Sequence, residues 1–117
     1  AVETLECWVA ALQHGTGPSI MALTRQNLDA LRTETVAENL SARGAYVLAD
    51  ADGDRAATIL ATGSEVEIAM AAKAELDAEG LPTAVVSMPC MDLFEQQGPG
   101  YRATVLGTAP RVEEEDE

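Results

Sequence analysis

Basic side chains are scarce in this sequence. Among 117 residues, 7 Lys and Arg stand against 20 Asp and Glu, which gives a formal net charge of -13. Proteins that bind nucleic acids or anionic membrane surfaces neutralise phosphate groups with Lys and Arg. The shortage of these residues therefore argues against a nucleic acid and against a membrane as the partner.

Long apolar runs, histidine and paired cysteines are scarce as well. No run approaches the roughly 20 apolar residues of a membrane span, and the first residues lack the basic start of a signal peptide, so we expect a soluble, cytoplasmic protein. His14 is the only histidine, and Cys7 and Cys90 lie far apart. These features predict no zinc site, no cysteine-histidine catalytic pair, and two reduced cysteines that serve packing.

The rest of the composition is that of a folded domain. Hydrophobic residues make up 47% of the chain, which is enough for a single modest core at this length. The acidic run at residues 113–117 is the exception, because like charges repel one another and attract water. We expect a solvated tail there.

The N-terminal part predicts a helix, a strand and a linker. A helix is expected from Val2 to His14, ended by a left-handed cap at Gly15. Residues 19–24 are apolar throughout, as in a strand buried on both faces. Residues 29–44 are mostly polar and predict a linker with one helical turn around residues 38–43. The apolar residues of the first helix recur on one face, which consists of Leu5, Trp8, Val9 and Leu12.

The following part alternates strands with a helix. Apolar runs at residues 45–49, 57–62 and 83–88 predict three strands, and the first two are close enough to pair as a hairpin. A helix separates the second run from the third, and such a unit forms the right-handed crossover of a parallel sheet. Short helices are expected at residues 92–96 and 101–106.

The helix between these strands carries the clearest local signals. Ser64 and Glu67 have the S-x-x-E spacing of a capping box, in which each side chain bonds to a backbone amide of the first turn. Gly80 stands where a C-terminal cap belongs, shortly before Pro82. We expect this helix to run to about Glu79. Its predicted buried face consists of Ile68, Ala69, Ala72 and Leu76.

Arg25 is the one candidate binding residue. It directly follows the run at residues 19–24, at the end of a strand where open parallel sheets present groups that bind ligands. A guanidinium group there is well shaped for a phosphate, although a surface arginine that closes a strand has the same pattern. Gly63 lacks the neighbouring lysine of a phosphate loop, and no serine has a histidine partner at hand.

Five motifs resemble the transketolase family. Their order and spacing are similar to the join between its pyrimidine-binding domain and its C-terminal domain, over about residues 4–112. They are A-L-T-R-Q-N-L at residues 22–28, G-A-Y-V-L at 44–48, A-T-G-S-E-V at 61–66, V-V-S-M-P at 85–89 with Asp92 and Phe94, and Tyr101-Arg102 with Val105 and Leu106.

The resemblance implies an α/β fold. We expect a partial three-layer sandwich with a β-α-β unit and a mostly parallel sheet, preceded by a helix and strand that belong to another domain. Transketolases are much longer, so the chain is expected to be a piece of such an enzyme. The implied parts are the end of the pyrimidine-binding domain at residues 1–28, a linker at 29–44, part of the C-terminal domain at 45–112 and the acidic tail at 113–117.

The resemblance also limits the implied chemistry. Transketolases use thiamine diphosphate with Mg²⁺ or Ca²⁺ to move a two-carbon ketol unit between sugar phosphates. The family's cofactor-binding and metal-binding segments, its activating glutamate and its substrate histidines have no counterpart in this sequence. We therefore expect no catalytic residue, cofactor or metal in this chain. Only Arg25 carries over, because the arginine of the family's L-[ST]-R-Q-N motif contacts the substrate's phosphate.

Two functions follow from this resemblance. The chain is either a transketolase-like C-terminal piece without activity of its own, or a self-associating or split-enzyme interaction module. The expected partner is a second copy or the complementary transketolase portion, because the strand at residues 19–24 and the face around Trp8 lack cover. Exchange of the N-terminal helix and strand between two copies is the favoured arrangement. Salt should strengthen it, because like charges oppose association.

Overall fold

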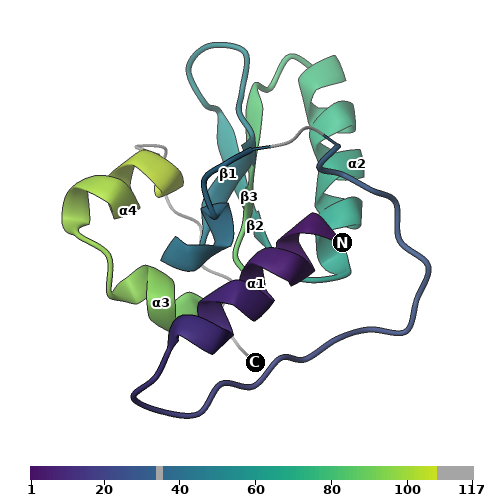
Figure 1. Ribbon diagram of the computed structural model, residues 1–117. Coiled ribbons are helices and arrows are strands. Elements are labelled where there is room, and N and C mark those ends of the chain that lie inside the picture. The colour runs from purple at the N-terminus through teal and green to yellow at the C-terminus, as the bar shows by residue number, and fades with distance from the viewer. Residues whose placement is uncertain (34–35, 108–117) are drawn as a thin grey trace, which may run out of the picture.

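The structure is a computed structural model that describes residues 1–33 and 36–107. A small sheet lies between helices, with α2 on one side and α3 and α4 on the other (Figure 1). The expected α/β class and its layers are thereby confirmed. The strands are β1 (Tyr46–Ala49), β2 (Ala57–Ala61) and β3 (Thr83–Ser87), and the helices are α1 (Val2–Gln13), the 3₁₀ helix η1 (Leu40–Arg43), α2 (Glu65–Ala78), α3 (Met91–Glu95) and α4 (Pro99–Leu106).

The sheet has the strand order β1-β3-β2. β2 and β3 are parallel and in register from Ala57 opposite Thr83 to Ala61 opposite Ser87, which confirms the predicted β-α-β unit. β1 runs antiparallel to β3, so the sheet contains one pair of each kind. The predicted hairpin between β1 and β2 is wrong. The crossover through α2 brings β3 into the place beside β2 that a hairpin partner would take.

β3 forms the centre of the molecule because both of its faces are covered. All its residues are buried, including Val85 and Val86 in the middle. On the side of α3 and α4, the ring of Phe94 meets the ring of Tyr101 edge to face at 6.2 Å. The Tyr101 hydroxyl donates a hydrogen bond of 2.6 Å to the carbonyl oxygen of Ala45. The core cluster on this side consists of Ala45, Val86, Phe94 and Val105.

The C-terminal end of α2 confirms the sequence prediction. Gly80 has a φ of 81°, a left-handed conformation that L side chains adopt only under strain. The amide of Gly80 donates to the carbonyl of Asp77 at 3.1 Å, and the amide of Leu81 donates to the carbonyl of Leu76 at 2.9 Å. This pair of bonds is a Schellman motif, which satisfies the last carbonyl groups of the helix.

The start of α2 differs from the prediction. Ser64 has helical dihedral angles and makes no side-chain cap bond, because an N-cap hydroxyl reaches the first amides only from an extended backbone. The turn at Gly63, with a φ of 59°, already makes the amide of Val66 a donor to a turn carbonyl. The predicted buried face is also rotated. Val66 and Ala69 are buried, whereas Ile68 is 70% exposed.

The polar side of α1 faces η1 and the sheet. The helix ends at Gln13, one residue before the expected end at His14, and neither Gly15 nor Gly17 is among the glycines with positive φ, so the predicted left-handed cap is wrong. Glu6 is buried, whereas Trp8 is 51% exposed and Leu12 is 78% exposed. The predicted apolar face therefore points to solvent, as expected for a face without cover.

The predicted strand at residues 19–24 is absent. The segment is exposed and has no regular secondary structure, with Ile20 at 94% exposure. Within the described ranges no strand pairs with it, and unpaired backbone groups must then face water. The helical turn expected around residues 38–43 is confirmed by η1. The proposed division into domains stays a prediction.

No helix in the described ranges combines the length and apolar character needed to span a membrane. The predicted acidic tail at residues 113–117 lies outside the described residues.

Candidate functional site

Arg25 lies on a long exposed loop that leaves α1 and returns towards η1 past α2 (Figure 1). Because the strand before it does not form here, Arg25 lies on backbone without regular secondary structure rather than at the edge of a sheet. Its neighbour Thr24 accepts a hydrogen bond of 3.3 Å from the amide of Gln26. The Arg25 side chain makes no hydrogen bond or ion pair with any described residue, so its donors are available to an anion.

A buried carboxylate of α1 binds the far end of this loop. Glu6 of α1 accepts hydrogen bonds from both Nη atoms of Arg32, at 2.5 and 3.0 Å. It also accepts one from the hydroxyl of Ser41 at 2.9 Å and one from the amide of Leu40 at 3.3 Å. The side chains of Glu6 and Arg32 are only 11% and 10% exposed. Such a bidentate pair, with its remaining acceptor sites filled, is the favourable form of a buried ion pair.

A second carboxylate holds α1 to the sheet. Glu3 accepts a hydrogen bond of 2.7 Å from the hydroxyl of Tyr46 on β1 and one of 2.5 Å from the hydroxyl of Ser87 on β3. The guanidinium of Arg32 lies 5.2 Å from the centre of the Tyr46 ring, a cation-π distance. Tyr46 therefore links the two carboxylates of α1.

Hydrogen bonds and opposite charge keep both Glu6 and Arg32 ionised. Burial pushes the pKa of Glu6 upward, but the hydrogen bonds from Arg32, Ser41 and Leu40 outweigh it, so the pKa lies below its usual value. The bonds to Glu6 raise the pKa of Arg32. Burial, and then the hydrogen bond to Glu3, raise the pKa of Tyr46, which stays a neutral donor.

The lowered pKa of Glu6 predicts a loss of stability in acid. The group stabilises the fold fully above the pKa of glutamate in the unfolded chain, about 4.3, and the contribution disappears as the pH falls through the lower folded pKa. Glu6→Gln should lower the free energy of unfolding at pH 7 by roughly 1.5–3 kcal/mol, the range for hydrogen bonds to a charged group.

Urea unfolding followed by circular dichroism from pH 7 to pH 3 measures both effects. The difference between the parent chain and Glu6→Gln should shrink below pH 4.5. A constant difference over the whole range would contradict the ionised state of Glu6. Glu95→Gln, an exposed carboxylate on α3, is the control and should change little.

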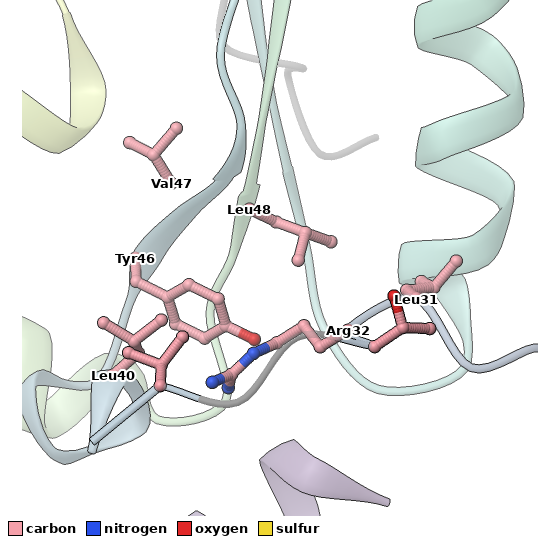
Figure 2. A pocket seen from close by; sticks show the side chains of 8 residues that line it. Leu31, Arg32, Leu40, Tyr46, Val47 and Leu48 are labelled. Carbon is pink, nitrogen blue, oxygen red and sulfur yellow. The ribbon is translucent and has the colours of Figure 1, made fainter. Parts of the chain in front are cut away.

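The described residues form two depressions that could hold a small molecule, and neither is lined by Arg25. The first has a volume of about 340 Å³, and Figure 2 shows Arg32 reaching into it towards Tyr46. The guanidinium of Arg32 already donates hydrogen bonds to Glu6, and most other residues that line this depression are aliphatic. The second, of about 280 Å³, lies between β2 and α2 and is lined by side chains such as Leu60 and Ile68. Neither offers the convergent polar groups that fix a ligand.

The described residues contain no group of three His, Cys, Asp or Glu side chains placed to hold a metal ion. Cys7 and Cys90 are free and partly buried. Burial raises the pKa of Cys7, so its thiol stays protonated and unreactive at neutral pH.

The sequence pattern did not reveal Glu6 and Arg32. They are 26 positions apart, and no periodicity links a helix to a linker over that distance. One signal was present, because Glu3 and Glu6 share a helix face opposite to Leu5 and Leu12. Two carboxylates on one face indicate that this face is either exposed to solvent or packed against buried hydrogen-bond donors. Only the fold distinguishes the two cases.

Comparison with known proteins gives a consistent result. The family described as "Transketolase-like TK C-terminal domain" matches residues 44–116. The transketolase of Cereibacter sphaeroides is 55% identical over 96% of this chain and 17% of its own length. Among solved structures, a transketolase of Leishmania mexicana matches with a TM-score of 0.77 and 37% identity over 89% of this chain and 15% of its own.

A Pichia stipitis transketolase solved in complex with sedoheptulose-7-phosphate also matches. Its TM-score is 0.77 at 35% identity, over 88% of this chain and 15% of its own. The chain thus spans about a sixth of the length of the relatives it matches.

Proposed function

The chain belongs to the transketolase family, and we propose that it supplies Arg25 to the site where such an enzyme holds the phosphate group of a sugar phosphate. The parent reaction is the thiamine-diphosphate-dependent transfer of a two-carbon ketol unit between sugar phosphates. The Pichia stipitis relative with bound sedoheptulose-7-phosphate supports the substrate class. By itself the chain is proposed to be inactive.

The state of Arg25 is the observation that carries this proposal. Three of the other basic side chains on the described residues are paired: Arg32 with Glu6, Arg55 with Asp50 and Lys73 with Asp77. Arg102 has no ion pair within those ranges, but it is half-buried. Arg25 is exposed and has no such partner within those ranges. In a chain with a net charge of -13, a cation left free of the many carboxylates is suited to an external anion.

The described residues do not fit thiamine diphosphate. A diphosphate and its metal need clustered oxygen ligands and several phosphate donors, and within those ranges no such cluster forms. Both depressions are lined mainly by aliphatic side chains. We therefore assign no step of the ketol transfer to this chain, and propose that the cofactor is held elsewhere in the enzyme.

Arg25→Ala tests the proposal. In a complete transketolase in which this chain replaces the matching segment of the Cereibacter sphaeroides relative, binding of a phosphorylated sugar should weaken roughly 10- to 150-fold. That corresponds to about 1.5–3 kcal/mol for a hydrogen bond to a charged group. The affinity for thiamine diphosphate should stay unchanged.

The control is Arg43→Ala, which removes another surface arginine whose side chain is 52% exposed. It should leave both affinities unchanged. Steady-state kinetics with phosphorylated and unphosphorylated acceptors measure the effect. Equal losses for the two kinds of acceptor after Arg25→Ala would refute a role in phosphate binding.

The exposed face of α1 supports a second function, that of an interaction module. Leu5 and Leu12 are 65% and 78% exposed and lie on the same face as Trp8. Such faces are usually covered by another surface. We propose that the complementary transketolase portion covers it, because the relatives are about six times as long and because two copies at -13 each repel one another.

Light scattering after size exclusion tests this interaction. Mixing the chain with the remaining portion of the Cereibacter sphaeroides relative should give a complex, and Trp8→Glu should weaken it. A homodimer of the chain alone that strengthens with salt would favour a second copy. The cytoplasm, where thiols stay reduced, is the compartment proposed for this function.

A further inference from the structure

We propose that Glu6 and Arg32 are positioning residues, which close the loop carrying Arg25 and hold it ready for a sugar phosphate. The inference rests on the proposed role of Arg25. It adds a pair of residues that touch neither substrate nor cofactor and act through the backbone between them. We call this pair the loop clamp.

The first observation is the place of the loop clamp in the chain. Glu6 lies in the first half of α1, and Arg32 lies near the far end of the loop that follows this helix, 26 positions later. Arg25 stands inside this closed segment. A loop of this length without secondary structure is uncommon in a compact protein and is usually functional or disordered. Its conformation then depends on what holds its ends.

The second observation is the quality of the contact. Both Nη atoms of Arg32 bond to the two carboxylate oxygens of Glu6, so the guanidinium is fixed in angle as well as in distance. Its plane also lies over the ring of Tyr46, which β1 holds in the sheet. Through Glu3, the same Tyr46 is bound to α1. The far end of the loop is thus attached to rigid elements on two sides.

The third observation is the burial of the pair compared with the other contact of the loop, which is made to α2. There the carboxyl of Asp29 lies beside that of Glu67, which is exposed, and the net effect of Asp29 raises the pKa of Glu67. That contact joins two acidic groups, whereas the side chains of Arg32 and Glu6 are 10% and 11% exposed and oppositely charged. Arg32 therefore supplies the buried ion pair at this end of the loop.

Loop length alone does not account for such a role. Without the loop clamp, the next hydrogen bond to α1 among the described residues is that of Asn39, which donates to the carbonyl of Glu6 at 2.9 Å. Lengthening the closed segment from 26 to 33 positions lowers the probability of loop closure by less than about twofold. A larger effect on binding requires the fixed direction that the bidentate bonds give. The expected cost of losing it is a 3- to 10-fold rise in KM for a phosphorylated acceptor.

The test has two parts, and the first uses the 117-residue chain. Backbone ¹⁵N order parameters of residues 16–31 should fall below about 0.6, the range of flexible backbone, in Glu6→Gln and Arg32→Lys, because neither glutamine nor lysine can form the bidentate ion pair. In the matched control Arg55→Lys, which changes an arginine paired with Asp50, the order parameters of this segment should not change. Unchanged order parameters in Glu6→Gln and Arg32→Lys would overturn the loop clamp.

The second part uses the complete enzyme described above. Arg32→Lys should raise KM for a phosphorylated acceptor 3- to 10-fold and leave kcat and the KM for an unphosphorylated acceptor unchanged. A purely structural defect would lower kcat for both acceptors. The double variant Glu6→Arg with Arg32→Glu restores opposite charges and should recover part of the KM. Lowered order parameters with an unchanged KM would overturn the positioning role.

The two proposals fail in different ways. If Arg25 does not bind phosphate, Arg25→Ala leaves the KM unchanged, and Arg32→Lys then still lowers the order parameters of the loop but leaves the KM unchanged as well. If Arg25 binds phosphate without help from the loop clamp, only Arg25→Ala raises the KM.

Discussion

Gly44→Ala is expected to remove most of the folded population of the chain. Gly44 has a φ of 85°, and a Cβ added there would meet the carbonyl oxygen of Cys90 and the amide nitrogen of Phe94 far inside van der Waals contact. Both obstacles are backbone atoms at the start of α3, and they cannot rotate away. The carbonyl of Gly44 also accepts a hydrogen bond of 3.0 Å from the amide of Cys90, and any shift of Gly44 would strain this bond.

The expected cost combines two effects. Left-handed strain costs about 1–3 kcal/mol, and overpacking costs about 1–3 kcal/mol more. A sum of roughly 2–6 kcal/mol is comparable to the whole stability of a small domain, about 5–15 kcal/mol. Thermal and urea unfolding followed by circular dichroism should show a greatly weakened transition, or none.

Gly80→Ala is the matched control. Gly80 has nearly the same φ, 81°, but no atom lies within 4 Å of the added Cβ. It should therefore lose only the strain, about 1–2 kcal/mol. If Gly44→Ala costs no more than Gly80→Ala, the close approach of α3 to Gly44 is wrong.

Phe94→Ala is expected to cost about 3–5 kcal/mol, the usual range for removing a buried phenylalanine. Phe94 is 5% exposed, packs in one cluster with Val86 and Val105, and meets the ring of Tyr101. Its loss opens a cavity between the sheet and the two helices on that side. The backbone hydrogen bonds of α3 remain, so the cavity is the main cost.

Met91→Ala on the same helix is the control for Phe94→Ala. Met91 is 61% exposed, and its truncation should change the free energy of unfolding by no more than about 0.5 kcal/mol. Phe94→Leu keeps most of the volume and should cost less than Phe94→Ala. A cost below 1 kcal/mol for Phe94→Ala would show that this cluster does not stabilise the chain.

The elements that could be predicted from the sequence are those whose contacts are local. The β-α-β unit is an example, because Gly63 and Gly80 mark the ends of α2 and the flanking apolar runs form the paired strands β2 and β3. The hairpin between β1 and β2 was wrong because strand order depends on a competing partner, β3, which comes later in the chain. The capping box at Ser64 was wrong because its spacing says nothing of the dihedral angles at that residue.

Distance along the chain also limited the prediction of the site. Arg25 could be found because it belongs to a short motif. The strand before it was expected from its apolar residues, but a strand needs a neighbour that pairs with it, and among the described residues 19–24 have none. Glu6 and Arg32 could not be paired, since each has an ordinary surface pattern and only the fold brings them together.

The bonds of Glu3 determine when α1 can take its place during synthesis. Its carboxylate reaches the hydroxyl of Ser87, 84 positions later in the chain. α1 therefore cannot complete these bonds until β3 has emerged from the ribosome. The segment from β2 to β3 needs only near neighbours and can fold as soon as it is complete. During that interval both faces of α1 are exposed to solvent or bound by a chaperone. Trp8 and Leu12 are then exposed apolar side chains that favour aggregation.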